Sequence, residues 1–197
     1  NGSGPATSPN SPTTEVTNII SGPFNNMGVP GAKSFHFVAP GYGNVAGVPL
    51  GLANPYYARM ATSSSATVLG DALAQNPTFF TLSEVGGNDV LGYALDGGAG
   101  ENQLGNYDPA TYGGSDITDP NVFASVFSSM VTGLTANGAK GVVTTVPYIT
   151  SLPNFTTIPH NPIPLDAANA TALNAGYAAY NGGLQFAYGA LGGMFTL

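Results

Sequence analysis

The fold of this chain is indicated by one stretch, TFFTLSEVGGND at residues 78–89. Its first part, residues 78–85, is rich in β-branched and aromatic side chains, which is typical of a buried strand. The pair Gly86-Gly87 then predicts a sharp turn, because glycine adopts backbone angles that other residues avoid. A similar run, GVVTTV at residues 141–146, follows later in the chain. We therefore expect two buried strands of one sheet.

Apolar spacing predicts helices around these strands. Residues 119–137 open with an Asp-Pro pair, carry apolar side chains three and four positions apart, and end at Asn-Gly. Two further helices are expected at residues 64–75 and at about residues 166–181. This order of elements predicts an α/β fold, a parallel sheet flanked by helices, in which the helix at 119–137 connects the two neighbouring strands.

The connections between these elements are expected to be long, since the 197 residues include 28 Gly and 16 Pro. Residues 1–23 are rich in Gly, Pro, Ser and Thr and are predicted to form an extended arm or loop. Residues 96–118 have the composition of a surface insertion. Residues 24–197 are then assigned to one α/β domain.

Composition also excludes several classes of function. Three Lys and Arg residues stand against ten Asp and Glu residues, so the formal net charge is −7. A chain with so few cations cannot track nucleic-acid phosphates or form a polybasic membrane patch. Cysteine is absent, and the two histidines match no metal-ligand spacing, so neither a metal site nor a cofactor is predicted. His36 and His160 are both interpreted as hydrogen-bonded loop or core histidines.

Two loops have the composition of a ligand site. Ligands of open parallel sheets bind beyond the carboxyl ends of the strands. The loop Gly86-Gly87-Asn88-Asp89 directly follows the first predicted strand, and NMGVPGAKS at residues 26–34 is the second candidate. Gly and Asn in such loops also serve ordinary turns, so each loop taken alone is consistent with a structural role.

Taken together, the two loops resemble a known family. The pattern Asn-x-Gly-x-x-Gly-Ala at residues 26–32, followed by Gly-x-Asn-Asp at residues 86–89, resembles blocks II and III of the SGNH (GDSL-type) hydrolases. Longer segments, FNNMGVPGAKSFH, NPTFFTLSEVGGNDVLGYAL and NGAKGVVTTVPYITSLPNF, are similar to large SGNH-like proteins of Gram-negative bacterial envelopes. The resemblance covers Phe24 to about Pro159 and implies a flavodoxin-like SGNH domain that is incomplete at both ends.

The resemblance implies a site and an activity. In that family a block I serine attacks an ester, while the block II glycine amide and the block III asparagine side chain stabilise the oxyanion. Gly31 and Asn88 match these two positions, and Gly28, Gly86, Gly87 and Asp89 match structural turn positions. The resemblance further implies a small-molecule or lipid or glycan ester as substrate. It also implies a membrane-protein partner at the cell surface, and a bacterial envelope, outer-membrane or secreted location.

Two blocks of the family pattern are missing from this sequence. No Gly-Asp-Ser or Gly-Asn-Ser occurs, and Gly70-Asp71-Ala72 lacks the serine. No aspartate is followed three residues later by histidine, so neither the nucleophile nor the Asp/His base is in this chain. We expect the segment alone to be an inactive part of a carboxylic-ester hydrolase. The alternative is a non-catalytic envelope subunit or binding module on an SGNH scaffold.

Overall fold

The computed structural model describes residues 15, 17–158 and 163–192. The chain divides into two compact units, residues 1–151 and residues 152–197, which are described separately below. Within the predicted arm, residues 1–14 and 16 lie outside the described residues. Residues 17–23 are exposed and belong to no helix or strand.

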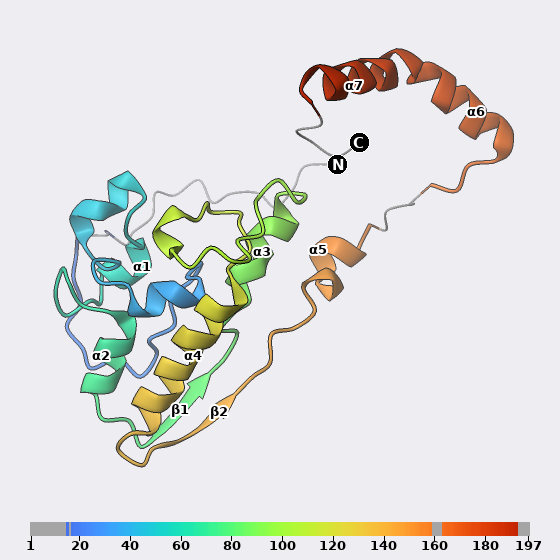
Figure 1. Cartoon of the computed structure of the whole chain (residues 1–197). Helices are drawn as coiled ribbons and strands as arrows, with labels where there is room; N and C mark the ends of the chain where they lie inside the picture. Colours follow the sequence, from blue (N-terminus) through green and yellow to red (C-terminus); the bar gives the residue numbers. More distant parts are fainter. Residues whose placement is uncertain (1–14, 16, 159–162, 193–197) are drawn as a thin grey trace. The chain divides into compact units, whose positions relative to one another are not determined.

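The first unit contains a small parallel sheet. Strand β1 (Phe79–Leu82) pairs with strand β2 (Lys140–Val143), with Phe79 opposite Lys140 and Leu82 opposite Val143. The predicted parallel pairing of neighbouring strands is therefore confirmed, and the chain is a mixed α/β protein (Figure 1). Both strands are shorter than predicted, because Glu84 adopts a left-handed φ of 60° and its N–H donates to the Thr144 side chain.

Helix α4 (Pro120–Thr135) connects β1 to β2 and matches the prediction for residues 119–137 to within two residues. The Asp119 carboxylate caps its first turn, accepting hydrogen bonds from the N–H groups of Asn121 (2.7 Å) and Val122 (3.1 Å). The buried face of α4, Val126, Met130 and Leu134, packs in one apolar cluster with Leu82 and Val85 at the end of β1. Figure 1 shows α4 running alongside the two strands.

A second apolar cluster lies beneath the short N-terminal helices. These are η1 (Ser34–Val38), η2 (Val45–Leu50), α1 (Pro55–Ala58) and α2 (Val68–Ala74). The cluster is built on Val29, Ala32, Tyr57, Ala61 and Val68. Helix α2 begins later than the predicted residue 64, because the Thr67 hydroxyl accepts the Gly70 N–H and caps the helix there.

The predicted surface insertion, residues 96–118, is anchored as well as exposed. It follows helix α3 (Asn88–Leu95) and contains the short helix η3 (Pro109–Thr111). The buried Asp116 carboxylate accepts hydrogen bonds from the Glu101 N–H (2.9 Å), the Gln103 side chain (2.6 Å) and the Gly113 N–H (2.6 Å). These hydrogen bonds, first of all the one from the Glu101 N–H, hold the pKa of Asp116 below its usual value. Desolvation by burial acts in the opposite direction and offsets only part of that shift.

The first unit ends after helix η4 (Ile149–Ser151), and the second contains α5 (Pro153–Thr156), α6 (Ala167–Gly176) and α7 (Ala178–Ala190). The single helix predicted at 166–181 is therefore wrong beyond its start: Asp166 caps α6, but the helix breaks after Gly176. The backbone at Tyr177, with φ of −94° and ψ of 4°, departs from helical angles and separates α6 from α7. No side chain among the described residues from 152 onward is buried.

Within the part of the chain that the structure describes, no helix combines the length and the hydropathy needed to cross a membrane.

Candidate functional site

The two candidate loops lie in contact, although they are far apart in sequence. The Asn88 side-chain amide donates a hydrogen bond of 3.0 Å to the Ala32 carbonyl, across 56 positions of sequence. Next to it, the Ser34 N–H and hydroxyl donate to the two carboxylate oxygens of Asp89, at 2.9 and 2.7 Å. Three hydrogen bonds therefore join the glycine loop to the start of α3.

The glycine loop takes its shape from a tight turn. The Ala32 N–H donates to the Val29 carbonyl (3.1 Å), and Gly31 has a φ of +76°. Proline at the second position and glycine with positive φ at the third are characteristic of a type II turn. Such a turn does not use the N–H of its third residue. The exposed Gly31 N–H has no acceptor among the described residues.

The second loop is a turn between β1 and α3. The Gly87 N–H donates to the Glu84 carbonyl (3.0 Å), and Gly87 precedes the first residue of α3. Gly86 has a φ of +103°, and a Cβ there would approach Val146 and Phe123 to 2.7 and 2.8 Å. This turn places Asn88 and Asp89 at the carboxyl end of β1.

The structure also locates the remaining turn residues predicted from sequence. The Gly28 N–H donates to the Asn26 side chain at 2.8 Å, which is local turn chemistry within the first loop. Asp89, buried and 4% exposed, accepts hydrogen bonds from the first loop rather than from its own turn. Its function in this structure is to hold the two loops together.

A buried lysine adds a contact that sequence reasoning missed. Lys33 follows the glycine turn, and its ammonium group donates to the carbonyls of Asp116 (2.8 Å) and Gly113 (3.2 Å) in the insertion. Burial lowers the pKa of Lys33, while the charges of Asp116 and Asp89 partly oppose that shift. Nothing local in the sequence pairs Lys33 with loop carbonyls some 80 residues away, so only the tertiary fold reveals this anchor.

His36 is a structural residue of this site. Its Nδ1 accepts the Lys33 N–H at 3.0 Å, and its ring stacks on Tyr42 with centroids 4.3 Å apart and planes at 7°. Burial, reinforced by the positive charge of Lys33, lowers the pKa of His36 to about 4. The interpretation of His36 as a hydrogen-bonded loop histidine agrees with this geometry. His160 lies outside the described residues.

Asp71, from the sequence Gly70-Asp71-Ala72, is likewise structural. It lies within α2 and accepts hydrogen bonds from the Tyr57 hydroxyl (2.8 Å) and from the Thr62 N–H (3.1 Å) and hydroxyl (2.5 Å). Burial and the contact with Asp71 raise the pKa of Tyr57 above its usual value. Asp71 links α2 to Tyr57 of α1 and to Thr62 beyond it. The segment Gly70-Asp71-Ala72 lies within a helix and is not a nucleophile elbow.

Two N–H donors of these loops have no acceptor among the described residues. Within the described ranges, the Gly31 N–H makes no hydrogen bond, and the Asn88 amide makes only the one to Ala32, which leaves its second N–H. Asn88 lies at the contact between the two loops, and Gly31 directly precedes Ala32, which makes that contact. Among the described residues, no group of three His, Asp, Glu or Cys side chains could hold a metal ion.

Comparison with models of known families, with curated proteins and with solved structures found no match for this chain.

His36 predicts an acid-sensitive stability. Because its folded pKa of about 4 is below the unfolded value of 6.5, the unfolded chain binds the extra proton between these two values. Stability should therefore fall as the pH drops from about 6.5 to 4, by about 1–3 kcal/mol after allowance for solvent screening. Thermal unfolding across this pH range measures the slope. His36→Phe should flatten it and His160→Gln should retain it; the reverse result would contradict the assignment.

Proposed function

We propose that residues 26–34 and 86–89 form the oxyanion-binding part of an SGNH-type carboxylic-ester hydrolase. The observation that carries the proposal is the hydrogen bond from the Asn88 amide to the Ala32 carbonyl, because it holds the asparagine against the residue that directly follows Gly31. The order of the two loops in the sequence is that of blocks II and III of this family. The substrate would be a small-molecule, lipid or glycan ester.

The proposed chemistry requires donors that are fixed before the reaction. When a nucleophile attacks an ester carbonyl, negative charge develops on the carbonyl oxygen, and preorganised N–H donors stabilise it. The type II turn fixes Gly31, and the buried Ser34–Asp89 contacts fix the loop that carries it. The nucleophile and its base would come from parts of a longer protein, in a bacterial envelope location with a membrane-protein partner.

Replacement of Asn88 tests this function in a longer protein that supplies the nucleophile. Asn88→Ala should lower kcat for a short-chain nitrophenyl ester by about 10²–10³-fold, the usual effect of removing one oxyanion donor. The matched control is Asn137→Ala, because Asn137 is exposed and its side chain makes, in the described part of the chain, only a long contact of 3.4 Å with Asn76. Unchanged turnover in a folded Asn88→Ala protein would contradict the proposal.

The same site is testable in the chain as it stands. Nuclear magnetic resonance titration with methylphosphonate, a small oxyanion, should shift the Gly31 backbone amide and the Asn88 side-chain amide together. The Asn88→Ala variant should lose the shift at Gly31. Equal shifts throughout the chain would indicate non-specific anion binding.

A second candidate is a non-catalytic binding module on the same scaffold. It is favoured by Ser34 and His36, the described serine and histidine beside the site, because both are already engaged in hydrogen bonds. Ser34 is fully buried and donates to Asp89, while Nδ1 of His36 is occupied by the Lys33 N–H. Neither serves as a nucleophile or general base in this arrangement. A longer protein that binds esters or glycans without hydrolysing them would favour the module.

A further inference from the structure

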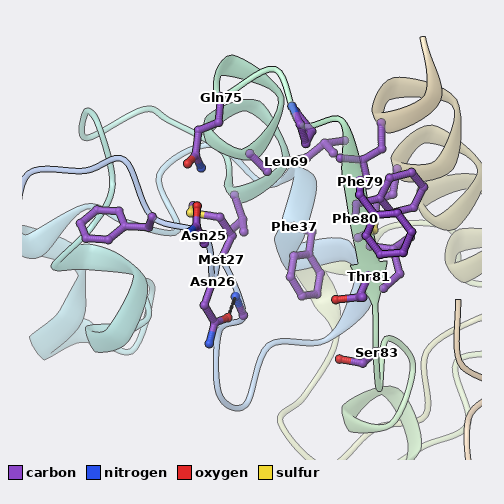
Figure 2. A pocket seen from close by; sticks show the side chains of 18 of the residues that line it. Asn25, Asn26, Met27, Phe37, Leu69, Gln75, Phe79, Phe80, Thr81 and Ser83 are labelled. Atoms are coloured by element: carbon purple, nitrogen blue, oxygen red, sulfur yellow. Dashed lines mark hydrogen bonds between the residues drawn. The ribbon is translucent and has the colours of Figure 1, made fainter. Parts of the chain in front are cut away.

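A groove runs along the edge of β1 that does not pair with β2. Its volume is about 720 Å³, and one wall is β1 with one flanking residue on each side, residues 78–83. The opposite wall is the irregular segment 23–28, and α2 contributes Leu69. Figure 2 shows the hydroxyl groups of Thr81, in β1, and of Ser83, just after β1, directed toward the space beside Asn26 and Met27. The groove is thus open between two stretches of backbone.

The backbone of β1 presents unused hydrogen-bonding groups to this groove. The Lys140 and Thr144 N–H groups donate to the carbonyls of Thr78 and Leu82, so the even-numbered residues of β1 face β2. Because successive residues of a strand direct their N–H and C=O groups to opposite edges, those of Phe79, Thr81 and Ser83 face the other way. No backbone partner for these three residues occurs among the described residues.

The segment 23–28, which forms the opposite wall, also has backbone groups without hydrogen-bond partners among the described residues. The backbone groups of Phe24, Asn25 and Met27 make no hydrogen bond within the described part of the chain. The unpaired N–H and C=O groups of an edge strand are a ready template for pairing with another extended segment. An extended peptide in the groove could therefore receive hydrogen bonds from both sides.

The lining of the groove defines the chemistry of its occupant. The 22 residues that line it include no Asp, Glu, Lys, Arg or His, and they are dominated by Phe, Leu, Val, Met and Pro together with Asn and Thr. A charged side chain placed there would be desolvated without a partner. A second copy of this chain cannot offer the equivalent edge of its own β1, because its segment 23–28 flanks that edge.

We propose that this groove binds an extended, uncharged segment of a partner polypeptide, which adds to β1 as a third strand. The five residues from Phe79 to Ser83 span about 16 Å of strand, which sets the length of the paired segment at about five residues. Main-chain hydrogen bonds supply the binding, as in other cases of strand addition, and the uncharged walls select the side chains. A two-stranded parallel sheet is small, and a third strand would extend its buried area.

A peptide copying residues 141–146, GVVTTV with blocked ends, is the uncharged probe, because β1 already pairs with residues 141–143 of this sequence at its other edge. It should bind saturably to the full chain and slow amide hydrogen exchange at Phe79, Thr81 and Ser83. Thr81→Pro removes one groove-facing N–H, and proline is tolerated at strand edges. This variant should bind the peptide about 10-fold more weakly or worse.

Val143→Pro is the matched control, because the Val143 N–H faces away from β1 on the outer edge of β2; it should bind as the unmodified chain does. Ser83→Pro provides the same test as Thr81→Pro if that variant does not fold. Absence of saturable binding up to about 1 mM peptide would overturn the proposal. Equal affinity of the folded proline variants and the unmodified chain, or protection confined to β2, would also overturn it.

Discussion

Replacing Gly86 by alanine is expected to destabilise the first unit by about 2–5 kcal/mol. Two costs add at this residue. Its φ of +103° is unfavourable for any side chain, and a Cβ would lie 2.7 Å from Val146 and 2.8 Å from the ring of Phe123. Small domains are stable by only about 5–15 kcal/mol, so much of that stability would be lost. Urea unfolding of the purified chain measures the change.

Gly138→Ala separates the two costs. Gly138 has a φ of +84°, but a Cβ there would meet nothing within 4 Å. Only backbone strain remains, so the expected loss is about 1 kcal/mol. Equal effects of the two substitutions would show that the space around Gly86 opens without cost, and would contradict the tight turn described at the carboxyl end of β1.

Replacing Asp89 by alanine is expected to cost about 2–5 kcal/mol, because two buried donors lose their acceptor. The Ser34 N–H and hydroxyl point at the two carboxylate oxygens, and Ser34 is fully buried, so water does not readily replace the lost contacts. Thermal unfolding gives the stability change. Chemical-shift changes at Gly31 and Asn88 would report the separation of the two loops.

Two milder variants show whether the loop-to-loop contacts carry this effect. Asp89→Asn keeps one oxygen acceptor and should lose less stability than Asp89→Ala. Ser34→Ala removes only the hydroxyl donor and should cost about 1 kcal/mol. If Asp89→Ala is no worse than Ser34→Ala, the hydrogen bond from the Ser34 N–H contributes little, and another contact joins the loops.

Local sequence patterns predicted the elements that make up the sheet. The charge-free run at residues 141–146 and the three- and four-residue spacing in 119–137 are local signals, and each produced a strand or helix where expected. Element ends were less predictable, because they depend on individual hydrogen bonds. Thr67 delays the start of α2, and Glu84 ends the β1–β2 ladder by turning its N–H to a side chain.

In the candidate site, too, the local turns are predictable from sequence and the contacts between them are not. The turn chemistry of Gly31 is readable from Val29-Pro30-Gly31-Ala32, since a type II turn is specified by its own residues. The contact between Asn88 and Ala32 is not readable from either loop. It depends on the turn after β1, which places Asn88 as the first residue of α3 next to the other loop.

The sequence by itself thus determined the capped central helix and the two glycine turns, because each depends on residues close together in the chain. The α/β class and the parallel pairing followed from the order strand, helix, strand along the chain. Only the tertiary structure decided what those turns contact. It placed Asp89 on Ser34 and directed the Lys33 ammonium group to the carbonyls of the insertion. It also left one edge of β1 without a backbone partner among the residues that the structure describes. Such contacts join residues tens of positions apart, and burial, which no local pattern encodes, gives them their strength.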